Sequence, residues 1–174
     1  MAKVLISQGC STEMAMRFSA LTLYDVALLI DDSTSMAVKD SENRIDTLRT
    51  IVHAIVKIKT IATIRFVSGG MIAANVTPEK VQKMFEAIRF DGLSMIGTAL
   101  KRRILEPLLY DRQHPRKKPL LIIVLTDGEV ECENEATLKT VIKESVTRMT
   151  HTGSNHTDKV GFTFVQVGNN FGRV

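Results

Sequence analysis

The apolar positions of the chain follow two different periodicities. Several continuous runs rich in Val, Ile and Leu are typical of strands that are buried on both faces of a parallel sheet. Between them, apolar residues recur every three or four positions, which indicates amphipathic helices. Because the two patterns alternate, they predict an α/β fold, a mostly parallel sheet with helices on both faces. The predicted strands are 23–30, 62–68, 71–75, 120–126 and 160–167, and the predicted helices are 44–59, 78–88, 98–109 and 135–149.

Chain length and one proline refine this picture. A chain of 174 residues is long enough to bury the core of one domain. We expect an N-terminal extension at 1–21 and a single domain over 22–174. Pro107 lies within the predicted helix 98–109, and because proline lacks a backbone N–H it should kink or end that helix.

The charge of the chain is uneven. The segment 101–118 holds seven basic residues and two acidic ones, whereas the whole chain carries a formal net charge of +4. Nucleic-acid-binding surfaces combine basic residues with aromatic side chains that stack on bases. Tyr110 is the single aromatic residue in this segment, and the chain has no Trp. We therefore interpret the segment as a solvated helix flank and loop, and expect no nucleic-acid partner.

Compartment and membrane association are read from the cysteines and the apolar runs. Cys10 and Cys132 are the two cysteines, too few and too far apart for a zinc or disulfide framework. The sequence contains no run of about 18 apolar residues that would suggest a membrane span. Its N-terminus lacks the apolar stretch of a signal peptide. The expectation is a protein of the reducing cytoplasm.

Polar side chains follow the apolar runs abruptly. The first strand ends at Asp31 and continues as Asp31-x-Ser33-x-Ser35, and 120–126 is followed by Asp127. Thr98, after Gly97, begins a predicted helix between these two strands. Because ligands of open α/β sheets bind beyond the carboxyl ends of the strands, these groups are expected at one rim. Carboxylate and hydroxyl oxygens suit a hard divalent cation such as Mg²⁺.

These segments resemble the three metal-binding loops of a von Willebrand factor A domain. The resemblance covers about Tyr24 to Gly168 and rests on Asp-x-Ser-x-Ser, Gly-Thr and Thr-Asp-Gly, which occur in the family's order. It implies a Rossmann-like sheet and a metal-ion-dependent adhesion site. It also implies a protein partner whose Asp or Glu carboxylate completes the coordination of Mg²⁺ or Mn²⁺. The implied metal ligands are Asp31, Ser33, Ser35, Thr98 and Asp127.

The chain also departs from the family pattern. Residues 93–96 are poorer in Gly and Pro than the corresponding loop usually is, and the family generally continues past 160–167 with a strand and a helix. The domain therefore looks short at its C-terminal side. If nothing follows it, 160–167 would be an apolar edge strand with few charges, and such edges promote association. We expect a chain of 174 residues to self-associate or to be marginally soluble.

Other interpretations of the same residues exist. Asp31, Ser33 and Ser35 could cap the following turn, and Thr98 could be a helix N-cap. Asp31-Asp32 also resembles the acidic pair with which a signalling receiver domain binds Mg²⁺ for phosphoryl transfer. A receiver needs a phospho-accepting Asp after the next parallel strand, and that strand ends in 66–69 without a carboxylate.

Two further classes of enzyme lack their motifs. A haloacid-dehalogenase-type phosphatase would need Asp at position 33, where this chain has Ser, and the four histidines lack metalloprotease spacing. No nucleophile and base can be paired from the sequence. We therefore expect a binding module and no enzyme, with the receiver-like phospho-acceptor as the alternative.

Overall fold

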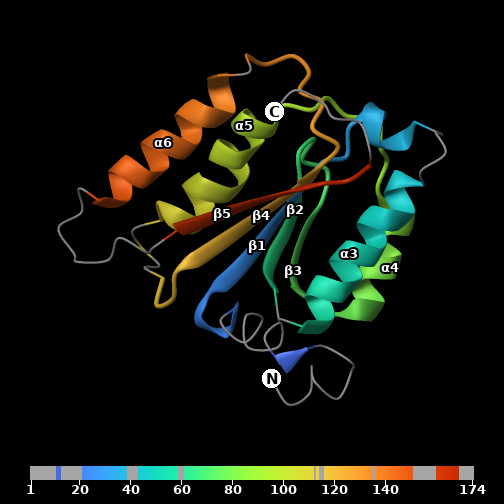
Figure 1. The fold of residues 1–174 in the computed structure, drawn as a ribbon, viewed down its shortest axis with the longest axis horizontal. Coiled ribbons are helices and arrows are strands. Elements are labelled where there is room, and N and C mark those ends of the chain that lie inside the picture. Colours follow the sequence, from blue (N-terminus) through green and yellow to red (C-terminus); the bar gives the residue numbers. More distant parts are fainter. Residues whose placement is uncertain are drawn as a thin grey trace.

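A five-stranded sheet forms the centre of the molecule, with strand order β3-β2-β1-β4-β5 (Figure 1). β1, β2, β4 and β5 are parallel, and β3 is antiparallel to β2. The computed structural model describes residues 11–12, 21–38, 43–58, 61–111, 113, 116–134, 136–150 and 160–168. The predicted extension 1–21 lies almost wholly outside these residues. The strands are β1 (Asp25–Ile30), β2 (Ile61–Phe66), β3 (Ile72–Val76), β4 (Leu120–Thr126) and β5 (Val160–Gln166).

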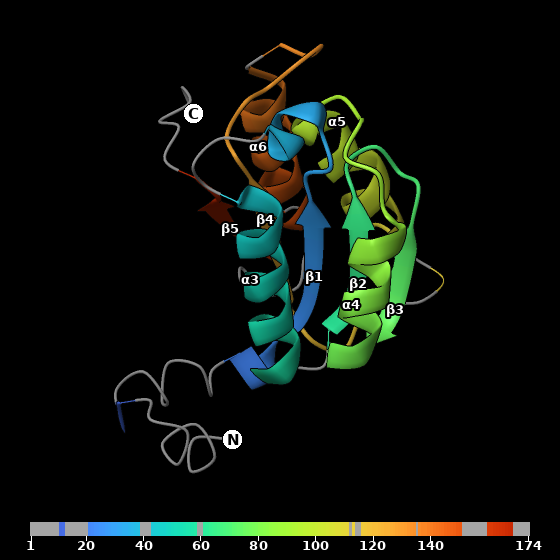
Figure 2. The same ribbon diagram turned by 90° about the vertical axis from the view of Figure 1, so that its right-hand side faces the viewer.

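Helices cover the sheet on both faces (Figures 1 and 2). α3 (Arg44–Ile58) and α4 (Pro78–Ala87) pack on one face. On the other face, α5 (Ile96–Ala99) continues into the π-helix η3 (Leu100–Leu109), beside α6 (Ala136–Thr150). Within the described ranges, no helix is long and apolar enough to cross a membrane.

The central strand β1 explains why the core has two halves. Val26, Leu28 and Ile30 belong to the apolar cluster under α3 and α4, whereas Ala27 and Leu29 belong to the cluster under η3 and α6. Successive side chains of a strand point to opposite faces, so an uninterrupted apolar run fills both clusters. All five side chains are buried. The predicted α/β fold with a mostly parallel, doubly covered sheet is therefore confirmed.

The helix that contains Pro107 differs from its prediction. It begins at Ile96, two residues before the predicted start, and continues past Pro107 to Leu109 as a π-helix. The backbone N–H of Tyr110 donates to the carbonyl of Leu105, a spacing of five residues that fits the wider turn. Pro107 lies inside this π-helix, which ends two residues later, and a kink at Pro107 stays a prediction.

Among the described strands, β5 lies at one edge of the sheet. Its Phe164 side chain is 40% exposed, whereas Val124, the partner of Phe164 on β4, is fully buried. The edge position agrees with the expectation for 160–167. Self-association through this edge stays a prediction.

Candidate metal centre

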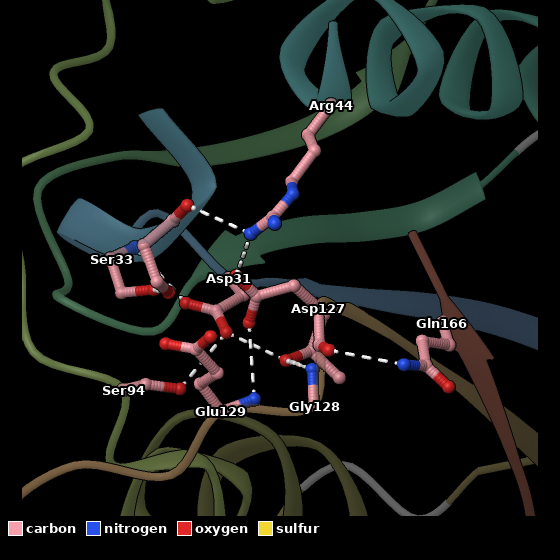
Figure 3. Close-up of polar contacts among 10 residues, drawn as sticks. Asp31, Ser33, Arg44, Ser94, Asp127, Gly128, Glu129 and Gln166 are labelled. Atoms are coloured by element: carbon pink, nitrogen blue, oxygen red, sulfur yellow. Dashed lines mark hydrogen bonds and ion pairs between the residues drawn. The ribbon is translucent and has the colours of Figure 1, made fainter. Parts of the chain in front are cut away.

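The carboxylate of Asp31 lies at the carboxyl end of β1 and is fully buried. Its Oδ1 accepts a hydrogen bond from the backbone N–H of Ser33 at 3.0 Å. Its Oδ2 accepts from the hydroxyls of Ser94 at 2.9 Å and Thr126 at 2.7 Å (Figure 3). Burial raises the pKa of Asp31, and the hydrogen bonds from Thr126 and Ser33 partly oppose this rise. All of these donors are neutral.

Two serine hydroxyls lie next to this carboxylate. Ser33 and Ser35 are buried, and their Oγ atoms are 2.9 Å apart. Ser35 belongs to η2 (Thr34–Ala37), the short 3₁₀ helix that turns the chain away from the sheet after β1. The two hydroxyls thus lie together in the loop that follows Asp31, and their role as metal ligands stays a prediction.

Asp127, after β4, has a different environment. Its Oδ2 accepts a hydrogen bond from the Arg44 guanidinium at 2.9 Å, and its Oδ1 accepts from the backbone N–H of Glu129 at 3.1 Å (Figure 3). Arg44 and Asp127 form an ion pair in which the side chains are 3% and 0% exposed. Arg44 also donates to the carbonyl of Ser35 at 3.1 Å. One guanidinium therefore joins the loops that follow β1 and β4.

Ser94 was not among the predicted ligands, yet it contacts Asp31. It is fully buried, and its loop is held to the Asp31 loop by a bridge between Ser33 and Gly92. It falls in 93–96, where the sequence departs from the family pattern, and Gly97-Thr98 gave the more visible match. The sequence signal that could have identified Ser94 is a hydroxyl residue in the loop before the predicted helix 98–109.

Thr98 lies further along, in α5. Its backbone N–H and that of Gly97 donate to the Glu133 carboxylate at 3.0 and 2.7 Å. Its side chain lines an open groove of about 600 Å³ between η3 and α6, together with Lys101 and Glu144. Metal ligation by Thr98 stays a prediction, whereas the hydroxyls of Ser94 and Thr126 both contact Asp31.

The Asp32 carboxylate has a different hydrogen-bond partner from the Asp31 carboxylate. Its carboxylate accepts from the backbone N–H of Ser68 at 2.8 Å and from the Ser68 hydroxyl. The Arg103 guanidinium in turn donates to the carbonyls of Val67 at 3.1 Å and Ser68 at 3.0 Å. Gly69 has a φ of +96°, and a Cβ there would overlap the guanidinium, so the loop after β2 needs glycine. The two neighbouring aspartates therefore serve separate contacts.

The donor set suits a hard divalent cation. In the part of the chain that the structure describes, no three His, Cys, Asp or Glu side chains gather into a cluster that could hold a metal. The set consists instead of carboxylates and neutral hydroxyls, which favour Mg²⁺ or Mn²⁺ over zinc. A buried carboxylate with only neutral donors is costly, and a bound cation would compensate its charge. The residues present thus fit such an ion.

Comparison with known proteins adds evidence on the fold. Neither a protein-family model nor a curated protein matches the chain by sequence. Among solved structures, the manganese-loaded TRAP protein of Plasmodium vivax aligns with a TM-score of 0.59 and 14% identity, over 84% of this chain and 57% of that one. An aerotolerance-related membrane protein of Bacteroides fragilis aligns with a TM-score of 0.54 and 15% identity, over 83% of this chain and 68% of that one.

A third structure supports the same conclusion. Proximal thread matrix protein 1 of the mussel byssus aligns with a TM-score of 0.56 and 17% identity, over 84% of this chain and 38% of that protein. The chain therefore spans little more than half of the TRAP structure and less of the byssus protein. At these identities the similarity concerns the fold. Together with the sheet order and the loops at its rim, it shows that this chain has the von Willebrand factor A fold.

Proposed function

We propose that the protein is an interaction module that binds a partner through a divalent cation, Mg²⁺ or Mn²⁺. In this proposal the ion is held by Asp31, Ser33, Ser35 and Ser94, with Asp127 close by, and accepts an Asp or Glu carboxylate of the partner protein. The observation that carries the proposal is the buried Asp31 carboxylate, which has only neutral donors and lies beside hydroxyl oxygens. The manganese-loaded state of the TRAP neighbour supports a cation in this fold.

The chemistry of the ligands supports a role in binding. Hydroxyls hold a cation without cancelling its charge, so the ion stays attractive to an external carboxylate. Mg²⁺ prefers octahedral coordination and retains exchangeable waters, one of which a partner can replace. Each step of this scheme uses oxygen atoms that the rim provides. A protein ligand that presents Asp or Glu is the partner class we propose.

A receiver-like phospho-acceptor is the alternative from another class. It requires Asp31 and Asp32 to share one ion, but the Asp32 carboxylate is engaged by Ser68, on different donors from those of Asp31. We therefore propose a module without catalytic activity. Incubation with acetyl phosphate and Mg²⁺ should leave the mass of the protein unchanged, and a phosphoryl adduct lost in Asp31→Asn would favour the receiver.

Calorimetric titration of the chain with Mn²⁺ tests the metal site. We expect one ion per chain, loss of binding in Asp31→Ala and weaker binding in Ser33→Ala. Ser94→Ala should weaken binding more than Thr98→Val if Ser94 is the third hydroxyl ligand. Ser145→Ala is the matched control, because Ser145 is equally buried and donates to the Ile142 carbonyl within α6. A folded protein that takes up no Mn²⁺ would contradict the proposal.

A further inference from the structure

The structure assigns Arg44 a role in the cation site: we propose that it couples metal binding to the binding of an anionic ligand. By cancelling the charge of Asp127, Arg44 lowers the affinity of the site for the metal alone. The bound ion then keeps more of its positive charge for a partner carboxylate. This inference rests on the proposed metal-dependent function and names what regulates that site.

The position of Arg44 supports this role. It is the first residue of α3, yet its side chain is 3% exposed, because it reaches back over η2 to the rim. It contacts both the Ser35 carbonyl and the Asp127 carboxylate, so it lies between the two loops that carry the candidate ligands (Figure 3). The guanidinium therefore brings a positive charge and several hydrogen-bond donors to this rim.

The charges around the rim divide into two groups. Asp127 has a cation at 2.9 Å, whereas the donors to Asp31 are all neutral. A cation that enters beside Asp31 therefore meets one carboxylate whose charge is free to attract it and a second whose charge is already compensated. Asp32 is engaged by Ser68, and the half-buried Glu129 adds a further negative charge at the rim. Asp32 and Glu129 are unchanged in every variant compared below.

The position of Arg44 makes two opposite outcomes possible. If Arg44 only holds the loops together, its removal should disorder the ligands and weaken metal binding. If it competes electrostatically with the ion, its removal should tighten metal binding, because Asp127 becomes available to the metal. The sign of the change in metal affinity therefore separates an electrostatic role of Arg44 from a purely structural one.

The experiment titrates Mn²⁺ into the full chain, with and without acetate as the carboxylate probe. In wild type, acetate should raise the Mn²⁺ affinity. In Arg44→Met, Mn²⁺ alone should bind about tenfold more tightly than in wild type, and the acetate effect should shrink. Arg49→Met is the control, since Arg49 lies on the same helix but its side chain is 37% exposed and pairs with Asp46. It should change neither value.

A second pair of variants covers the case in which Arg44→Met fails to fold. Asp127→Asn removes the carboxylate that pairs with Arg44 and keeps the guanidinium beside the site, and Arg44→Met/Asp127→Asn removes both charges. The double variant should bind Mn²⁺ more tightly than Asp127→Asn. Thermal unfolding in Mn²⁺ and in EDTA gives an independent measurement. The difference in Tm between these two conditions should be larger for Arg44→Met than for wild type.

The outcomes separate the two proposals. Wild type that binds no Mn²⁺ would overturn the proposed function and this inference with it. Wild type that binds Mn²⁺ through Asp31, with Arg44→Met no tighter or the double variant no tighter than Asp127→Asn, would overturn the inference alone. Tighter binding in both comparisons, with a reduced acetate effect, would establish it.

Discussion

The loops after β1 and β4 present the same residue type in opposite electrostatic environments. The two strands are neighbours, and the backbone N–H of Asp31 donates to the carbonyl of Leu125, so Asp31 and Asp127 end adjacent strands at one rim. Asp31 receives neutral donors, whereas Asp127 is paired with the buried Arg44. Equal positions in the sheet therefore do not give equal chemistry. The first loop is suited to attract a cation, and the second is held by one that the protein supplies.

Asparagine substitutions should separate the two aspartates most strongly. With EDTA present, Asp127→Asn breaks the buried ion pair between Arg44 and Asp127 and should lower the free energy of unfolding by about 3–5 kcal/mol. Asp31→Asn removes a buried charge that has no counter-ion among the described residues, so the change should stay within about 1 kcal/mol. Urea unfolding measures both values.

The opposite order of stabilities would break the comparison. A stable Asp127→Asn protein would mean that the ion pair contributes little to the fold. A strongly destabilised Asp31→Asn protein would mean that its three hydrogen bonds, rather than an unbalanced charge, dominate the first loop.

Gly97→Ala tests how the packing of α5 supports the Ser94 hydroxyl beside Asp31, and its expected effect is smaller. A Cβ at Gly97 would lie 2.7 Å from the backbone nitrogen of Leu138, so α5 and α6 would have to move apart. We expect a loss of about 1–3 kcal/mol in the free energy of unfolding. Because Ser94 lies two residues before α5, Mn²⁺ binding should weaken as well, while the Arg44–Asp127 pair is untouched. Gly70→Ala is the control, since no heavy atom lies within 4 Å of its Cβ position; equal effects of the two variants would contradict this expectation.

The pH dependence of stability should show the smallest difference. Burial raises the pKa of Asp31 above its ordinary value of 3.8, so the folded protein binds this proton more tightly than the unfolded chain. Its stabilising contribution is complete below pH 3.8 and is lost as the pH rises through the folded pKa. With EDTA present, the stability of wild type relative to Asp31→Asn should therefore fall over this range. Unfolding of both proteins at a series of pH values measures the difference, and parallel curves would contradict it.

Much of the fold followed from local sequence pattern. β4 has the predicted limits of 120–126, and β1 begins within two residues of its prediction, because buried parallel strands are continuous apolar runs. The positions of Asp31, Ser33 and Ser35 also follow from spacing within one loop. The π-helical form of 100–109 was not predicted, because sequence periodicity does not reveal such a turn.

The contacts that distinguish the two loops are not local. Arg44 and Asp127 are 83 positions apart in the sequence, and Ser94 and Asp31 are 63 apart. In the sequence Arg44 is an ordinary polar residue at the start of an amphipathic helix. Only the packing of α3 against the rim turns it into the partner of a buried carboxylate, so no pattern in the chain could have predicted the pair.

Anomalous diffraction from crystals soaked in Mn²⁺ tests the central claim most directly. The predicted result is one manganese peak at the rim, bounded by the Asp31 carboxylate and the hydroxyls of Ser33, Ser35 and Ser94, with Arg44 still paired to Asp127. The absence of a peak in fully soaked crystals would contradict the claim. A peak elsewhere, for example beside Glu106 and Glu144 in the groove between η3 and α6, would contradict it equally.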